Sequence, residues 1–250
     1  RVGINESSQF ASALLLLANI GGWNIQIDGE LGAKSPYVAM TSSLIERFPI
    51  EGGRLIIEPD ASSGSYFWAA GHILSVDDGL PIRVARWPKS GWQIDAEFPN
   101  FLPVPNVVSR LNDLGDSIMT SIVIAPLANH QTQFINLERL RLQECERVQA
   151  LRVELTKCGA EIKETGDALT ISPGELKGAE IETYDDHRIA MCFATLGLKV
   201  PGIRIKNPSC VRKTFPTFFY KLAAPRPVGL GAAVLDGQGN KLAVENLIAD

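Results

Sequence analysis

One short stretch of the sequence, residues 184–191, combines acids, an imidazole and a guanidinium. It places Asp-Asp-His-Arg at 185–188, and an apolar run from Ile189 to Leu198 follows directly. This order indicates a polar turn that leads into a buried helix. Charged groups at the start of a buried helix are costly unless they pair with one another or bind a ligand. Two interpretations are open: Asp186 caps the helix while Arg188 pairs with an acid, or the turn binds an anion.

Three further polar stretches precede segments that we expect to be helical. They are Ser-Ser-Gln at 7–9, Asp-Ala-Ser-Ser at 60–63 and Gly-Asp-Ser at 115–117. The start of a helix offers free backbone N–H groups and the positive end of the helix dipole, which together favour phosphate or carboxylate ligands. Each stretch also fits an ordinary N-cap, so none of them indicates a binding site by itself.

A denser group of charges lies in the middle of the chain. Arg141, Glu144 and Arg147 are spaced three apart, which predicts that they share one face of a helix. That face is either a solvated row of salt bridges or an anion site with a carboxylate held among arginines. Together, Arg147, Arg188 and Lys213 would suit a substrate with several negative groups. Spacing alone does not show that they converge.

The bulk composition narrows the class of protein. The chain has 250 residues, is 45% hydrophobic and 21% charged, and has a net charge of -4, which indicates a soluble globular protein of one large or two medium domains and argues against a nucleic-acid groove. The longest apolar run, Phe10 to Ile20, is interrupted by Ser12 and Asn19, so it indicates a core helix and not a membrane span. The cysteines are far apart and lack metal-ligand spacing, which fits reduced thiols, no metal site and a cytoplasmic location.

Hydrophobic periodicity predicts an alternation of helices and short strands along the chain. This alternation indicates an α/β (α+β) fold built from a repeated supersecondary unit. After Pro225 the sequence changes to a linker and a predicted hairpin over 232–235 and 241–244, to which we assign no role. Helices are predicted over 10–20, 37–48, 65–74, 114–127, 142–158, 189–198 and 214–222, and strands over 23–28, 54–58, 82–86, 131–136, 161–163, 168–171, 180–183 and 202–206.

Considered together, the motifs resemble the 5-enolpyruvylshikimate-3-phosphate synthase family, in order and in rough spacing, from Ser7 to about Leu222. The Ser-Ser-Gln motif separates this family from the related UDP-N-acetylglucosamine enolpyruvyl transferases. The motifs that carry the resemblance are Ser-Ser-Gln at 7–9, Pro-Tyr-Val-Ala-Met-Thr at 36–41, Glu-Pro-Asp-Ala-Ser-Ser at 58–63, Asp116, Glu-Cys-Glu-Arg at 144–147, Tyr-Asp-Asp-His-Arg-Ile-Ala-Met at 184–191 and Lys-Thr-Phe-Pro at 213–216.

The resemblance implies the enolpyruvyl transferase fold, in which two lobes are built from repeated βαβαββ units around a cleft. Residues 1–58 would then end the N-terminal lobe, residues 59–223 would form the C-terminal lobe, and residues 224–250 would be a tail. The implied reaction joins shikimate 3-phosphate and phosphoenolpyruvate into an enolpyruvyl ether and releases phosphate. It needs neither a metal nor an organic cofactor.

The resemblance also implies roles for particular side chains. Asp116 would take the proton from the attacking hydroxyl, and Glu144 would take part in proton transfer to and from the methyl carbon. The implied substrate-binding residues are Ser7, Ser8, Gln9 and Tyr37 for shikimate 3-phosphate, and Arg147, His187, Arg188 and Lys213 for phosphoenolpyruvate.

Two departures from the family pattern affect the expected function. Position 143 is a glutamine where the family has a lysine, and the first half of the family's sequence is absent. We therefore expect the C-terminal part of the enzyme, which needs a missing N-terminal lobe as its partner and is inactive alone. Two alternatives stay open: a transferase for another hydroxylated acceptor, which Gln143 would favour, and a non-catalytic truncated relative. We expect neither nucleic acid nor a membrane as a partner.

Overall fold

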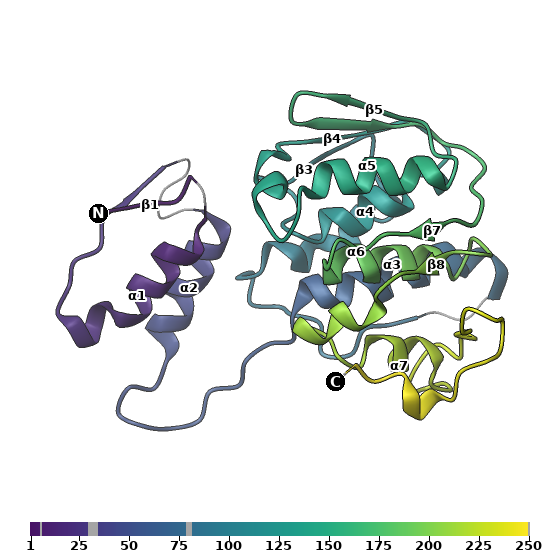
Figure 1. Cartoon of the computed structure of the whole chain (residues 1–250). Helices are drawn as coiled ribbons and strands as arrows, with labels where there is room; N and C mark the ends of the chain where they lie inside the picture. Colours follow the sequence, from purple (N-terminus) through teal and green to yellow (C-terminus); the bar gives the residue numbers. More distant parts are fainter. Residues whose placement is uncertain (6, 30–34, 79–81, 250) are drawn as a thin grey trace.

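The computed structural model describes residues 1–5, 7–29, 35–78 and 82–249. Figure 1 shows two groups of elements, which are joined by an extended segment that runs from α2 to α3. The smaller group, on the left, pairs β1 (Val2–Gly3) in parallel with β2 (Ile27–Asp28). Against these strands lie α1 (Gln9–Gly21) and α2 (Pro36–Arg47), which pack on each other.

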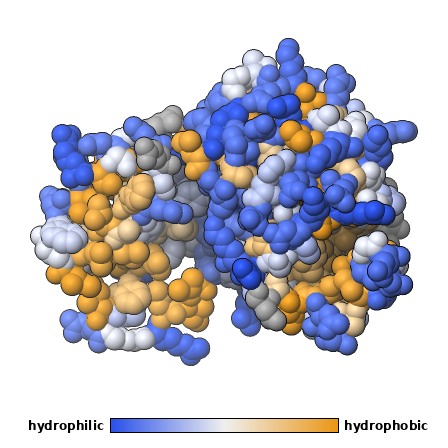
Figure 2. Space-filling model, in the orientation of Figure 1, coloured by the Kyte–Doolittle hydropathy of each residue, from blue (hydrophilic) through white to orange (hydrophobic). Residues whose placement is uncertain are grey.

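The buried core of the smaller group is very small. It consists of Ile4, Ala11 and Val38, each with 0% of its surface exposed. Most of the remaining apolar surface of α1 faces outward, as the orange side chains on the left of Figure 2 show. Ile20 at the end of α1 is 88% exposed. These elements therefore bury little apolar surface among themselves.

The larger group contains one complete βαβαββ unit. Its order is β3 (Val107–Ser109), α4 (Ile118–Ile124), β4 (Thr132–Ile135), α5 (Arg147–Lys157), β5 (Ile162–Thr165) and β6 (Ala168–Ile171). The strands lie in the order β3-β4-β6-β5, with β3 parallel to β4 and the other pairs antiparallel. This unit confirms the predicted α/β class and the predicted repeat. The orders β1-α1-β2-α2 and β7-α6-β8 begin in the same way.

The core of the larger group lies among its helices and beneath the sheet. The helix α3 (Ala61–Asp78) packs on α4 and α6 (His187–Leu196), and α4 also contacts α5. Every residue of α4 is buried, because α3, α5 and α6 all pack against this helix. The remaining elements are η2 (Ile94–Phe101), η3 (Ala125–Leu127), η4 (Glu138–Leu142), β7 (Glu180–Ile181), β8 (Arg204–Ile205), η5 (Pro208–Lys213), α7 (Phe218–Ala223) and η6 (Val244–Asn246).

Several predicted element boundaries are wrong. The strands expected over 54–58 and 82–86 do not form in the described residues, and Ile56 and Ile57 are 79% and 74% exposed, without a neighbouring strand. The strand β3 was not predicted. The helices expected from 114, 142 and 214 begin later, at Ile118, Arg147 and Phe218, because polar turns or 3-10 turns precede them.

The tail after Pro225 returns to α7. The amide N of Leu230 donates to the carbonyl O of Lys221 at 3.1 Å, and the amide N of Tyr220 donates to the carbonyl O of Leu247 at 3.1 Å. The predicted hairpin is reduced to a single bridge between Leu235 and Lys241. Among the described residues, no helix is long and apolar enough to cross a membrane.

Candidate active site

The predicted site residues of the larger group all lie after a strand, either before the next α-helix or in its first turn. Asp116 lies between β3 and α4, and Glu144 lies between β4 and α5. His187 and Arg188 follow β7, and Lys213 follows β8. Since the ends of parallel strands point the same way, these turns bring residues that are distant in the sequence to one place. In α/β proteins this edge is where ligands bind.

Asp186 is a buried carboxylate with two roles. It caps α6, because its Oδ1 accepts a hydrogen bond from the amide N of Arg188 at 2.8 Å. Its Oδ2 also lies 2.6 Å from Nε of Arg147. The turn before it holds Tyr184 and Asp185 with φ of 54° and 56°, a left-handed conformation that is uncommon outside glycine. The cap interpretation and the site interpretation of this stretch are thus compatible, because one side chain makes both contacts.

Arg147 is the centre of the ion pairs. Its side chain is 1% exposed, and its Nη2 lies 2.6 Å from Oε2 of Glu144. The other oxygen of Glu144, Oε1, lies 2.7 Å from Nζ of Lys213. Burial alone would raise the pKa of Glu144, but the hydrogen bond from Lys213 and the charge of Arg147 outweigh burial and hold that pKa below its usual value. Two of the predicted cations therefore do converge on a predicted catalytic carboxylate.

Asp116 lies among three arginines. Its Oδ1 lies 2.8 Å from Nη2 of Arg110, and its Oδ2 lies 3.5 Å from Nη2 of Arg188 and 3.8 Å from Nη1 of Arg147. Burial would raise the pKa of Asp116, but the charges of Arg188, Arg110 and Arg147 hold it well below the usual range. We call these residues the arginine–carboxylate cluster: Arg110, Asp116, Glu144, Arg147, Asp186, Arg188 and Lys213.

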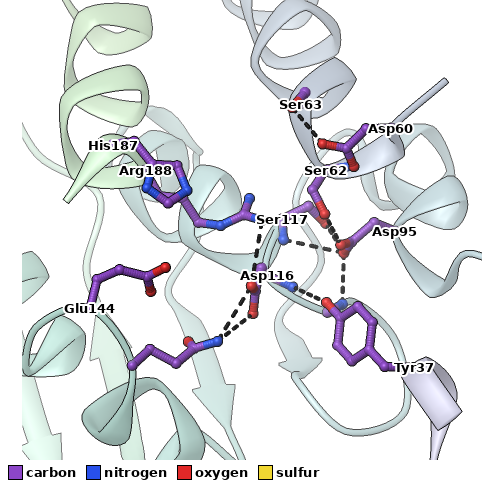
Figure 3. A network of polar contacts seen from close by, with 12 residues as sticks. Tyr37, Asp60, Ser62, Ser63, Asp95, Asp116, Ser117, Glu144, His187 and Arg188 are labelled. Carbon is purple, nitrogen blue, oxygen red and sulfur yellow. Dashed lines mark hydrogen bonds and ion pairs between the residues drawn. The ribbon is translucent and has the colours of Figure 1, made fainter. Parts of the chain in front are cut away.

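The turn that carries Asp116 is held in place by a second buried carboxylate. Asp95 is 3% exposed and accepts hydrogen bonds from the amide N of Gly115 at 2.7 Å and from Oγ of Ser117 at 2.5 Å. Ser62 donates to the other oxygen of Asp95. Burial raises the pKa of Asp95. Figure 3 shows this network beside Asp116. Because Asp95 bonds to Gly115 and Ser117, it holds the turn in place and not the carboxylate of Asp116.

Tyr37 reaches the same turn from the smaller group of elements. Its Oη accepts a hydrogen bond from the amide N of Asp116 at 3.3 Å. A cavity of about 70 Å³ beside this contact is lined in part by Tyr37, Ser62 and Asp95. A wider cavity of about 310 Å³ lies between α2 and residues 91–97. Tyr37, a predicted shikimate 3-phosphate ligand, therefore contacts the turn that carries Asp116.

His187 and Arg188 differ in their surroundings. His187 has a side chain that is 4% exposed, and its Nδ1 has no hydrogen-bond partner among the described residues. Burial, with a smaller effect of Arg188, lowers the pKa of His187 to about 4, so the imidazole is neutral at pH 7. Arg188 extends toward Asp116 in Figure 3, and its Nη1 lies 3.5 Å from Oη of Tyr66.

One expectation about the charged residues differs from the structure. Arg141 does not share a helical face with Glu144 and Arg147, because only Arg147 lies in α5; it pairs instead with Glu146 and Glu164. In the part of the chain that the structure describes, the Ser-Ser-Gln motif makes no hydrogen bond or ion pair with the arginine–carboxylate cluster. Ser8 is 9% exposed, and the Oγ of Ser7 accepts from the amide N of Gln9 at 3.1 Å.

Sequence reasoning missed three residues of the site. Arg110, Asp95 and Tyr66 have no motif around them, and Asp95 lies in a Trp- and Pro-containing segment without hydrophobic periodicity. The one usable signal was Gly115: a Cβ there would lie 2.5 Å from Oη of Tyr37 and 3.1 Å from Oδ1 of Asp95. A glycine beside a candidate catalytic acid indicates such close approach.

Comparison with known proteins adds a family to this geometry. The family model for EPSP synthase (3-phosphoshikimate 1-carboxyvinyltransferase) matches residues 97–222, half of the chain, and this segment contains Asp116, Arg147 and Arg188. The chain belongs to the EPSP synthase family. This membership confirms the predicted family and the enolpyruvyl transferase fold.

Individual EPSP synthase relatives cover more of the chain. A 3-phosphoshikimate 1-carboxyvinyltransferase of Laribacter hongkongensis is 37% identical over 90% of this chain and 62% of its own length. One of Nostoc punctiforme is 35% identical over 86% of this chain and 59% of its own length. The chain thus spans about 60% of these relatives. A solved EPSP synthase of Acinetobacter baumannii is 22% identical, with a TM-score of 0.49 over 69% of this chain and 48% of its own.

Proposed function

We propose that this chain is the C-terminal part of an enzyme that transfers the enolpyruvyl group of phosphoenolpyruvate to the 5-hydroxyl of shikimate 3-phosphate and releases phosphate. The observation that carries the proposal is the convergence of Arg147, Arg188 and Lys213 around Asp116 and Glu144. In this proposal residues 1–58 belong to the N-terminal lobe, residues 59–223 form the C-terminal lobe, and the enzyme works in the cytoplasm. The names of the relatives favour shikimate 3-phosphate over another hydroxylated acceptor.

The cations of the cluster suit a substrate with a phosphate and a carboxylate. Arg147, Arg188 and Lys213 provide donors from the three different segments that follow β4, β7 and β8, so they can bind an anion from several sides. His187 lies beside them as a neutral imidazole. In our proposal these four side chains bind phosphoenolpyruvate, while Ser7, Ser8, Gln9 and Tyr37 bind shikimate 3-phosphate.

The two carboxylates divide the proton transfers between them in this proposal. Asp116 accepts the proton of the attacking hydroxyl, and Glu144 exchanges a proton with the methylene carbon of phosphoenolpyruvate. Without substrate, both carboxylates are paired with cations that lower their pKa values, which makes them weak bases. A bound anion would share the positive charge of Arg147 and Arg188 and would make Asp116 more basic. Substrate binding would thereby prepare the base for general base catalysis.

The missing part of the N-terminal lobe is the proposed partner of the α1–α2 surface. Phe10, Leu16, Leu17 and Ile20 of α1 are each more than half exposed, as is Trp23 after it. Apolar side chains gathered in this way favour contact with a further apolar surface. Figure 2 shows hydrophobic side chains gathered over the smaller group of elements, on the left of the view. We therefore propose that the enzyme is complete only when another piece of protein covers this face.

Calorimetric titration of phosphoenolpyruvate into the chain, with and without shikimate 3-phosphate, tests the proposed substrates. We expect Arg188→Ala to weaken phosphoenolpyruvate binding by about tenfold to a hundredfold, the worth of a charge-assisted contact. Arg204→Ala is the matched control, because Arg204 lies on β8 and is exposed. Equal affinities for the two variants, or no binding of either compound by the unaltered chain, would overturn the proposal.

A phosphate-release assay tests the division into lobes. We expect the chain alone to release no phosphate from phosphoenolpyruvate in the presence of shikimate 3-phosphate, because part of the cleft is supplied by the other lobe. Turnover by the chain alone at an ordinary rate, about 1 per second or more, would show that the second lobe is not required.

A further inference from the structure

We propose that Arg110 supplies the positive charge beside Asp116 that residue 143, a glutamine, does not carry. In this proposal Arg110 is a positioning residue, which orients the carboxylate and keeps it ionised for the proton transfer described above. The inference therefore rests on the proposed function for its catalytic meaning. Its structural basis is the set of contacts around Asp116 in the substrate-free chain.

Arg110 makes the shortest ion pair of Asp116. Its Nη2 lies 2.8 Å from Oδ1, whereas the nearest atoms of Arg188 and Arg147 lie 3.5 Å and 3.8 Å from Oδ2. The side chain of Arg110 is 9% exposed, and its Nε is buried without a hydrogen-bond partner among the described residues. A buried arginine that leaves one donor unused is costly. Its guanidinium pairs with Asp116, and this contact gives that cost a functional reason.

Gln143 makes a weaker contact with Asp116 than Arg110 does. Its Nε2 lies 3.3 Å and 3.4 Å from the two oxygens of Asp116, so the contact is long and carries no charge. Its Oε1 accepts a hydrogen bond from Nη1 of Arg147 at 2.7 Å. A lysine at 143 would place an ammonium group against that arginine and close to Arg110. The glutamine and Arg110 are therefore compatible with each other, and a lysine and Arg110 are not.

The two residues come from different turns. Arg110 directly follows β3, and Gln143 follows η4, which comes after β4. The charged contact to Asp116 thus comes from the turn after β3, and the neutral contact comes from the residue after η4. When a bound anion engages Arg147 and Arg188, Arg110 would be the arginine that still pairs with Asp116 on the side away from the ligand.

The titration of the Asp116 carboxyl group tests this assignment without any catalytic assay. Carbon-13 NMR of the carboxyl groups, in the 250-residue chain labelled at aspartate, follows each midpoint as the pH changes. We expect Arg110→Met to raise the Asp116 midpoint by about 1 pH unit or more, since an opposite charge at this distance shifts a pKa by about 1–3 units. The titratable and charged groups that face Asp116 and stay in place are Arg147, Arg188, Tyr37 and Asp95.

Exchange variants make the test specific. Gln143→Lys in the Arg110→Met background should return the midpoint of Asp116 toward that of the unaltered chain. Gln143→Lys alone should lower the thermal unfolding temperature, because it crowds cations. Gln143→Ala should move the Asp116 midpoint by less than about 0.5 pH unit, in keeping with a long neutral contact. Arg110→Lys keeps the charge and guards against a loss of folding in the methionine variant.

The outcomes separate this inference from the proposed function. A midpoint of Asp116 that is the same with and without Arg110, or one that depends on Gln143 as strongly as on Arg110, would overturn the inference. Repeating the titration with saturating phosphoenolpyruvate should enlarge the effect of Arg110→Met. If phosphoenolpyruvate does not bind at all, the proposed function fails, whereas the result of the substrate-free titration stands on its own.

Discussion

Replacing Asp186 by asparagine tests whether one buried carboxylate organises both α6 and the anion site. The change removes a negative charge and leaves the shape of the side chain. Asp186 is 0% exposed, accepts from the amide N of Arg188 at 2.8 Å and lies 2.6 Å from Nε of Arg147. An asparagine Oδ1 can still accept from the helix amide, but its Nδ2 cannot accept from the guanidinium.

The expected loss of stability depends on the contacts that Arg147 loses in this variant. Removing one partner of a buried ion pair costs about 3–5 kcal/mol, but Arg147 keeps Glu144 at 2.6 Å. We therefore expect the free energy of unfolding of Asp186→Asn to fall by about 2–3 kcal/mol, the worth of a hydrogen bond between charged groups. Asp186→Ala also loses the helix cap and should cost about 1 kcal/mol more. Urea denaturation followed by far-ultraviolet circular dichroism measures both values.

The neighbouring aspartate provides the matched control. Asp185 has the same side chain but an exposed position, and it contacts Asn207 on the surface. Asp185→Asn should change the free energy of unfolding by less than about 0.5 kcal/mol. If Asp186→Asn and Asp185→Asn have the same small effect, the reasoning that Asp186 compensates the buried charge of Arg147 is wrong. A large effect of Asp186→Ala together with a small one of Asp186→Asn would assign the role to the cap alone.

Three further predictions concern the surroundings of the cluster. Gly115→Ala should lower the free energy of unfolding by about 1–3 kcal/mol, because the added Cβ would lie 2.5 Å from Oη of Tyr37; an unchanged midpoint in urea would contradict this. The folded-state pKa of His187 is lowered from 6.5 to about 4, so the unfolded chain binds the proton first as the pH falls. As the pH falls from 6.5 to about 4, the free energy of unfolding should therefore fall by up to about 3 kcal/mol. His187→Gln should lack that fall when the variant and the unaltered chain are unfolded in urea at a series of pH values. Arg139 donates to the carbonyl O of Ile4 at 2.7 Å, so Arg139→Ala should speed amide hydrogen exchange around Ile4 severalfold, and equal exchange rates would refute this link between the two groups of elements.

Helices were predictable from the sequence where apolar residues recur with the period of a helix and a known stop signal follows. The helix α1 ends at Gly21, and Gly22 has the left-handed φ of 64° expected of a C-cap glycine. Strands were predicted less well because they are only two to four residues long in the described chain. Alternation over so few residues carries almost no periodic signal, which is why β3, with three residues, was missed. Ile56 and Ile57 gave a false strand signal: they are apolar in sequence, but in the structure their side chains are exposed and they belong to no described strand.

The carboxylate and arginine residues of the site were predictable only where they lie within a recognisable motif. Asp116, Glu144, Arg147 and Arg188 stand in recognisable stretches, and the structure brings them together. Arg110 could not be found in this way, because its importance depends on a contact across a turn and on the identity of residue 143. Whether the Ser-Ser-Gln motif binds substrate stays a prediction.

The self-pairing of the cluster explains how charged groups at buried helix starts are tolerated without a ligand. Arg110, Arg147, Arg188 and Lys213 each lie within 4 Å of a carboxylate oxygen of Asp116, Glu144 or Asp186. A polyanionic ligand must therefore compete with these carboxylates, and its affinity is the difference between two sets of ion pairs. The carboxylates that it would displace from arginine and lysine are Asp116 and Glu144, the two that the proposed reaction needs as bases. Asp186 is fully buried and also caps α6, so it would keep Arg147 in place during this exchange. In the proposed reaction, the cluster would thus couple anion binding to the basicity of Asp116 and Glu144 through shared partners.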